Sequence, residues 1–252
     1  MEAKIDMCGI VGYIGENKAA PILMEGLEHL EYRGYDSAGI AVQTKNRIKV
    51  TKEVGKLNEL KNLLDFNKEN GVRGIGHTRW ATHGRPSKIN SHPHYDCNNE
   101  FAVVHNGIIE NFQELKDDLS ERGHIFKSET DTEVIAHLIE EKYTSNLKEA
   151  VREAVKVLEG SYALAVLSTK EPDKIIGVRK DSPLVIGKSN GENFIASDMT
   201  AFLSYTDQFY ILDDGEMAEV QKDDIKLFDL SGEKINKDIF EVDWDAEMAE
   251  KA

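Results

Sequence analysis

The second half of the chain, from residue 162 onward, consists of short apolar runs separated by turn residues. We expect strands at 162–167, 175–179, 184–186, 194–197, 209–212, 217–220 and 225–228. A series of this kind predicts antiparallel sheet. Because helical patterns precede this series, the chain as a whole is expected to have an α+β fold.

The first half combines single strands with amphipathic helices. Apolar runs predict strands at 9–14, 40–43, 48–52, 74–77 and 101–105, the last ending at Asn106-Gly107. Helical spacing predicts helices at 19–30, 57–66, 112–122 and 147–158. A further helix is expected to begin near Thr130, which has the capping-box spacing to Glu133. The segment 31–39 is expected to be a loop.

The composition excludes several classes of protein. The chain has 252 residues, 40% of them hydrophobic, which is enough for a sizeable core. The formal net charge of -15 argues against nucleic acid or an anionic membrane surface as a partner, because both need clustered Lys and Arg. No apolar run approaches the roughly 18 residues of a membrane-spanning helix. Residues 1–7 do not have the pattern of a secretory signal, and two cysteines make no disulfide framework, so a cytoplasmic protein is expected.

Cys8 stands at the start of the first expected strand, in Cys-Gly-Ile-Val-Gly. If this cysteine becomes the first residue of the mature chain, its own α-amine, with a pKa near 8, can accept the thiol proton. That arrangement would make Cys8 an amino-terminal nucleophile. The alternative is a small cysteine buried in an edge strand.

The stretch 77–84, His-Thr-Arg-Trp-Ala-Thr-His-Gly, places many polar side chains at the end of a strand. Strand ends commonly lead into binding sites. The guanidinium of Arg79 can hold a carboxylate with two parallel hydrogen bonds. The alternative is a surface ion pair of Arg79, with Trp80 packed in the core.

Asn106-Gly107 and Asp131 each admit two interpretations. Asn-Gly after an apolar strand is a strong hairpin signal, but a helix is expected next and not a returning strand. The other interpretation is an oxyanion hole formed by the Asn106 amide and the Gly107 backbone N–H. Asp131 could stabilise the first turn of a helix through the helix dipole, or it could receive a substrate ammonium group.

His92, His94 and Cys97 lie close together in the sequence and could suggest a metal. His-x-His with one Cys is not a four-ligand zinc pattern, so no metal is expected. The glycines near the amino terminus form no dinucleotide fingerprint, and there is no phosphate-binding Walker loop. We therefore expect no cofactor.

Five stretches together resemble one family. They are residues 8–12, 31–39 (Glu-Tyr-Arg-Gly-Tyr-Asp-Ser-Ala-Gly), 77–84, 105–111 (His-Asn-Gly-Ile-Ile-Glu-Asn) and 128–134 (Ser-Glu-Thr-Asp-Thr-Glu-Val). In this order they resemble the class II glutamine amidotransferases of the amino-terminal-nucleophile hydrolase fold, and among these the glutaminase domains of glucosamine-6-phosphate synthases. The resemblance runs from Cys8 nearly to the end of the chain. It implies a four-layer sandwich, with two antiparallel sheets between layers of helices.

The resemblance also implies a role for each site residue. Cys8 would attack the side-chain amide of glutamine, with its α-amine as base, and Asn106 and Gly107 would hold the oxyanion. Arg79 would bind the α-carboxylate of glutamine and Asp131 its α-ammonium. The other residues implied in the site are Arg33 and Gly34, which brace Cys8, Trp80, which closes over substrate, and Thr82, His83 and His92, which line the pocket.

Two features set this chain apart from the pattern. Residues 1–7 precede Cys8 as a tag, an alternative start or a pro-segment, and while they remain the Cys8 nitrogen is an amide. The domain is expected to cover 8–252, without the carboxy-terminal sugar isomerase part of the synthases, which would be its partner in a full-length homodimer. The alternatives are a catalytically silent glutamine-binding module and an amidotransferase for a different acceptor.

Overall fold

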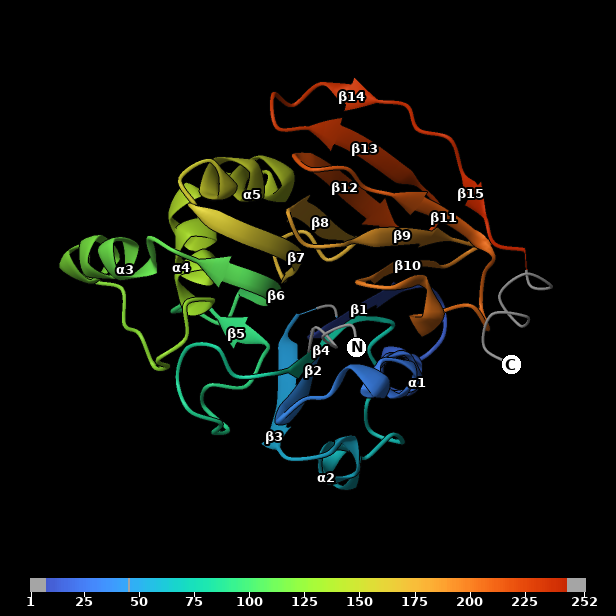
Figure 1. Ribbon diagram of the computed structural model, residues 1–252, viewed down its shortest axis with the longest axis horizontal. Helices are drawn as coiled ribbons and strands as arrows, with labels where there is room; N and C mark the ends of the chain where they lie inside the picture. The colour runs from blue at the N-terminus through green and yellow to red at the C-terminus, as the bar shows by residue number, and fades with distance from the viewer. Residues whose placement is uncertain (1–7, 45, 244–252) are drawn as a thin grey trace, which may run out of the picture.

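The computed structural model describes residues 8–44 and 46–243 and contains two antiparallel sheets flanked by helices (Figure 1). The first sheet has the order β15-β11-β9-β10-β1-β4-β2-β3. Its strands are β1 (Gly9–Ile14), β2 (Ser37–Gln43), β3 (Ile48–Val54), β4 (Arg73–Arg79), β9 (Val185–Lys188), β10 (Asn193–Ala196), β11 (Gln208–Ile211) and β15 (Phe240–Glu241).

The second sheet has the order β14-β13-β12-β8-β7-β6-β5. Its strands are β5 (His94–Tyr95), β6 (Phe101–Ile109), β7 (Gly160–Ser168), β8 (Lys174–Lys180), β12 (Glu216–Gln221), β13 (Ile225–Asp229) and β14 (Lys234–Ile235). The helices are α1 (Ala19–His29), α2 (Leu57–Leu63), α3 (Phe112–Glu121), α4 (Glu133–Lys142) and α5 (Leu147–Val155), with 3-10 turns at Glu31–Arg33 and Met199–Ala201.

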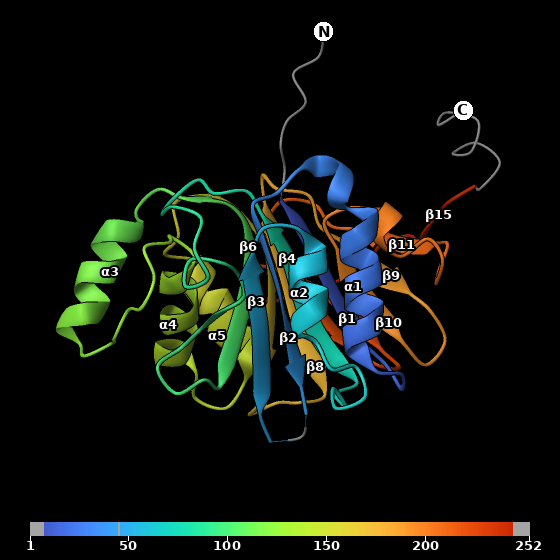
Figure 2. The same cartoon turned by 90° about the horizontal axis from the view of Figure 1, so that it is seen from below.

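Three apolar cores separate four layers. One core joins α1 and α2 to the first sheet through residues such as Leu27 and Leu60. The middle core lies between the sheets and includes Ile10 and Ala163. The third joins α4 and α5 to the second sheet, and Figure 2 shows these two helices on the side of the molecule away from α1 and α2. The expected α+β four-layer sandwich is therefore confirmed.

Strand β1 lies inside the first sheet, between β10 and β4. All six of its residues are buried, because helix α1 covers one face of the sheet and the second sheet covers the other. A strand covered on both faces shows a continuous apolar run instead of alternation, as Gly9–Ile14 does. This position fixes the residue that precedes β1, Cys8, at the end of a fully packed strand.

Several predicted details are wrong. Strand β6 does not end before Asn106 but continues to Ile109, paired with β7 along its whole length. Glu133 does not form a capping box with Thr130, because its carboxylate accepts the backbone N–H groups of Lys127 and Ser128. The segment expected as a loop at 31–39 contains a 3-10 turn and the start of β2.

Short strands β5, β14 and β15 carried too little apolar pattern to be predicted. Residues 1–7 and the acidic residues 244–252 lie outside the described part of the chain. Among the helices that the structure describes, none has the length and apolar character needed to cross a membrane.

Candidate active site

A cavity of about 230 Å³ opens where β1 begins and where β4 ends, against β6 of the other sheet. The predicted site residues that line it are Cys8, Arg79, Trp80, Thr82, His92, Asn106, Gly107 and Asp131. Residues of the lining that sequence analysis did not single out are His105, Ile108, Thr132, Ser161, Ser182 and Pro183. The fold thus brings most of the predicted site together from five separate parts of the chain.

Cys8 directly precedes β1, and its thiol lies beside the backbone of Trp80. The Trp80 N–H donates to Cys8 Sγ at 3.1 Å, and Sγ lies 3.7 Å from the Trp80 carbonyl oxygen. Burial raises the pKa of the Cys8 thiol, while the Trp80 hydrogen bond and the charge of Arg79 act in the opposite direction. The thiol therefore needs a base to become a nucleophile, and the N–H donor is in place to stabilise the thiolate.

Asn106 links the two sheets at the cavity. Its Nδ2 donates to the Cys8 carbonyl oxygen at 2.9 Å, and its Oδ1 lies 2.8 Å from Nε2 of His77 on β4. Burial lowers the pKa of His77 to about 3, so the ring is neutral and its Nε2–H donates to Asn106. An amide NH₂ has two donors, so one remains for a ligand in the cavity. His77 fixes which way the amide points.

Gly107 has a backbone conformation that favours glycine, with φ of 125°. A Cβ at this position would lie 2.2 Å from the Ser161 carbonyl oxygen on the paired strand, closer than any real contact. Glycine therefore allows β6 to continue through the cavity wall without a side chain between the backbone and a ligand.

Arg79, the last residue of β4, is a buried cation, and one of its nitrogens has no partner in the described part of the structure. Its Nη2 donates to the carbonyl oxygens of His83 and Gly84, the latter at 3.1 Å. Its Nη1 is buried and has no partner among the described residues. Burial lowers the pKa of Arg79, with Asp36, Cys8 and Asp131 opposing this shift. A buried guanidinium with an unsatisfied N–H is suited to bind a carboxylate.

Asp131 supplies the opposite charge on the side of the second sheet. It precedes α4, is buried, and its Oδ2 accepts the Ile109 N–H at 2.9 Å. The next residue, Thr132, is held through its Oγ1, 2.9 Å from His105 Nδ1. One cation and one carboxylate in the same cavity match the head group of an amino-acid zwitterion.

Two residues that sequence analysis assigned no role hold the cavity walls. The Asp36 carboxylate accepts the Ala81 N–H at 2.6 Å and thereby fixes the segment after Arg79. The half-buried Lys52 ammonium donates to the carbonyl oxygens of Ser91 and Pro93 at 2.6 and 3.1 Å, on either side of His92. Asp36 lies within a stretch that carried the family resemblance, whereas Lys52 gave no signal in the sequence.

Three of the predicted site residues are not among the cavity lining. Gly34 lines a separate surface hollow together with Tyr35 and Lys56. The His83 ring packs against Phe112, with ring centroids 5.1 Å apart. The Arg33 backbone lies in the 3-10 turn Glu31–Arg33, and its side chain is outside the described part of the structure. Their roles in the site stay predictions.

The buried histidines around the cavity predict acid sensitivity. Burial lowers the pKa values of His77, His92, His94 and His105, so these rings are neutral in the fold and take up protons on unfolding below pH 6.5. Because the unfolded chain binds more protons, stability falls as pH falls. With four such groups, the free energy of unfolding should fall by up to about 5 kcal/mol for each pH unit near pH 5.

Urea unfolding at pH 7, 6 and 5 measures this slope. His77→Gln should remove about one of the protons taken up on unfolding and so lower the slope by about 1.4 kcal/mol per pH unit. Asn58→Gln, at an exposed position of α2, is the control because it removes no titratable group, and it should leave the slope unchanged. Equal stability at pH 7 and pH 5 would contradict the prediction.

Comparisons with known proteins identify relatives of this chain. Two curated relatives carry the name glutamine--fructose-6-phosphate aminotransferase [isomerizing]. The one from Caldanaerobacter subterraneus is 55% identical over 97% of this chain. The one from Thermococcus kodakarensis is 53% identical over 98% of this chain. The chain spans 40% and 41% of the length of these relatives.

A solved structure of glutamine phosphoribosylpyrophosphate amidotransferase from B. subtilis has a similar fold. It superimposes with a TM-score of 0.78 at 29% identity, over 90% of this chain and 50% of that one. A glutamine aminotransferase class-II domain protein from Silicibacter pomeroyi shares the fold, with a TM-score of 0.59 at 13% identity.

Residues 77–204 match the family described as the glutamine amidotransferase domain. This match begins in β4 with His77, includes Arg79, Asn106, Gly107 and Asp131, and ends after β10. The chain therefore belongs to the glutamine amidotransferase family.

Proposed function

We propose that this chain hydrolyses L-glutamine to L-glutamate and ammonia through a γ-glutamyl thioester on Cys8. The observation that carries this proposal is the cavity. It is lined by the Cys8 thiol, by Asp131 and by Arg79, whose Nη1 has no partner among residues 8–44 and 46–243. Arg79 would hold the α-carboxylate of glutamine and Asp131 its α-ammonium. The side-chain amide would then reach Cys8.

The proposed reaction begins once the Cys8 nitrogen is a free α-amine. The amine takes the thiol proton, and the thiolate attacks the side-chain carbonyl carbon of glutamine. The ammonium then gives its proton to the departing nitrogen, which leaves as ammonia when the C–N bond breaks. Water adds to the thioester, the C–S bond breaks, and glutamate and the cysteine are released.

The oxyanion of both steps would be held by Asn106 and the Gly107 backbone. One Asn106 N–H already bonds the Cys8 carbonyl, which positions the amide beside the reacting sulfur. Asn106→Ala should therefore lower kcat about 10²–10³-fold, with a much smaller change in KM, because the oxyanion donor acts in the transition state.

Steady-state kinetics of ammonium release measures the effect of Asn106→Ala. The matched control is Asn58→Ala, at an exposed position of α2, which should keep the parent kcat. A thermal unfolding curve on each variant separates loss of fold from loss of chemistry. Parent kcat in a folded Asn106→Ala protein would argue against the oxyanion role.

The acceptor and the cell compartment belong to the same proposal. The relatives that this chain matches are named as aminotransferases for fructose-6-phosphate and are more than twice its length. We propose that the ammonia serves to convert fructose-6-phosphate to glucosamine-6-phosphate, with a sugar isomerase domain as partner, in a cytoplasmic homodimer. On this basis the chain alone should form no amino sugar from fructose-6-phosphate.

The direct test uses protein that begins at Cys8, verified by intact mass. Equal amounts of glutamate and ammonium from L-glutamine support the proposal, as does stoichiometric labelling of Cys8 by an electrophilic glutamine analogue. Glutamine binding without either product would instead indicate a silent binding module. Turnover with no preference for L- over D-glutamine would contradict the roles of Arg79 and Asp131.

A further inference from the structure

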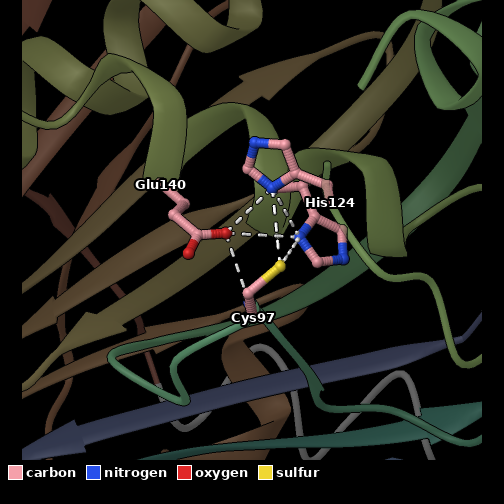
Figure 3. Close-up of side chains that lie close together, drawn as sticks. Cys97, His124 and Glu140 are labelled. Atoms are coloured by element: carbon pink, nitrogen blue, oxygen red, sulfur yellow. Dashed lines mark hydrogen bonds and ion pairs between the residues drawn. The ribbon is translucent and has the colours of Figure 1, made fainter. Parts of the chain in front are cut away.

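A second cluster of reactive side chains lies away from the cavity lining, beside helix α4. Cys97 comes from the turn between β5 and β6, and His124 from the connection that follows α3. His137 and Glu140 are three residues apart on α4 and so share one face of the helix. Figure 3 shows the Cys97 sulfur, the Glu140 carboxylate and His124 turned toward one another. One donor atom from each of the four residues lies within 4.8 Å of the others.

The distances between these donor atoms are those of a metal-binding tetrahedron. With zinc–sulfur bonds of about 2.3 Å and zinc–nitrogen or zinc–oxygen bonds of about 2.0 Å, the S–N edges should be about 3.5 Å and the N–N and N–O edges about 3.3 Å. Cys97 Sγ lies 3.6 Å from Nδ1 of both histidines. The two Nδ1 atoms are 3.3 Å apart, and they lie 3.0 and 3.4 Å from Glu140 Oε2.

The outer nitrogens of both rings face other carboxylates. His124 Nε2 lies 3.0 Å from Glu141 Oε1, and His137 Nε2 lies 3.8 Å from Glu133 Oε1. For His124 the carboxylate is at hydrogen-bond distance and holds the proton on Nε2, as in metal centres where an outer carboxylate orients a histidine ligand. His137 Nε2 is buried and has no hydrogen-bond partner among the described residues. Nδ1 of each ring lies among the other donor atoms of the cluster, where both can bind one cation.

We propose that Cys97, His124, His137 and Glu140 bind one zinc ion, the chemistry that a mixed sulfur, nitrogen and oxygen set favours. Four protein ligands fill a tetrahedral shell, so the ion is structural and not catalytic. The His137 side chain is buried, and those of His124 and Glu140 are only 9% and 16% exposed.

The consequence for the proposed active site is mechanical. The ion would join the β5–β6 turn and the α3–α4 connection to α4, the helix that begins directly after Asp131 and Thr132. The sequence had suggested Cys97 with His92 and His94, but the His92 ring packs on His77, with centroids 4.3 Å apart, at the cavity. Neighbours in the chain were thus the wrong partners for Cys97.

The test measures metal on the full chain carrying Cys8→Ala, which leaves Cys97 as the remaining thiol. After treatment with a strong chelator, this protein should take up one zinc per chain. Zinc should raise Tm by about 5 °C at a concentration 100 times Kd. Cobalt(II) in place of zinc should give the intense absorption of a tetrahedral thiolate complex.

Cys97→Ser should lose the cobalt–thiolate absorption, and His124→Gln should lower zinc affinity at least about 10-fold. His29→Gln is the matched control and should bind zinc as the parent does. Zinc uptake by the chelator-treated Cys8→Ala protein tests the proposal whether or not the other variants fold. Absence of zinc uptake by folded parent protein, or uptake unchanged in both variants, would overturn the proposal. Either result leaves the glutaminase proposal standing, because that one is tested on ammonia release.

Discussion

Replacing Cys8 by alanine should lower glutamine hydrolysis at least about 10⁴-fold while the protein stays folded. The sulfur is the only part of the residue that is lost, and its hydrogen bonds in the described part of the structure are with the Trp80 backbone. Its removal leaves the pairing of β1 with β4 and β10 unchanged. The loss therefore concerns the covalent step, since no thioester can form without the sulfur.

Ammonium and glutamate release from the Cys8→Ala protein measures this effect, and calorimetry with L-glutamine provides the control. Binding should persist, because Arg79 and Asp131 are still present. Loss of turnover with retained binding separates the nucleophile from the binding groups. Ammonium production at the parent rate would show that the hydrolysis does not pass through Cys8.

Protein that retains residues 1–7 should hydrolyse glutamine no faster than the Cys8→Ala variant does. An acylated nitrogen is not basic, whereas a free α-amine has a pKa near 8. Burial raises the pKa of the Cys8 thiol, which makes the need for a nearby base greater. The extension thus removes the base that the proposed mechanism requires.

A protease site placed directly before Cys8 allows the same preparation to be assayed before and after cleavage. Intact mass reports the amino terminus in each sample. Activity should appear in proportion to the fraction of chains that begin at Cys8, and it should not appear in cleaved Cys8→Ala protein. Full turnover by chains whose mass includes residues 1–7 would refute the role of the α-amine.

The sequence predicted most of the elements but could not predict how they pair. Local apolar patterns identified β1 and β7, yet nothing in them places β1 between β4 and β10, because pairing depends on residues far apart in the chain. Asn106-Gly107 shows how a local signal is overridden. The nine-residue ladder between β6 and β7 continues through it, and the packing of that ladder outweighs the turn preference of two residues.

Most of the predicted residues that line the cavity lie in stretches that resemble a family, which is why the sequence could indicate them. The contacts that position them could not be predicted in this way. His77 was visible in such a stretch, but its hydrogen bond to Asn106 depends on how the two sheets stack. The proposed donor set comes from three separate parts of the chain, with Cys97 before β6, His124 after α3, and His137 and Glu140 on α4, so spacing along the chain carried no signal for it.

The cavity draws its groups from both sheets. Cys8 and Arg79 come from the ends of β1 and β4 in the first sheet. Asn106 lies on β6 of the second sheet, and the Asp131 carboxylate accepts a hydrogen bond from the N–H of Ile109 on the same strand. A sliding movement of one layer over the other would separate sulfur from amide and cation from anion at the same time. Substitutions such as Ile10→Val, in the apolar layer between the sheets, would then slow turnover before they unfold the chain. Enzymatic rate would in this way report how well the two halves of the sandwich stay aligned.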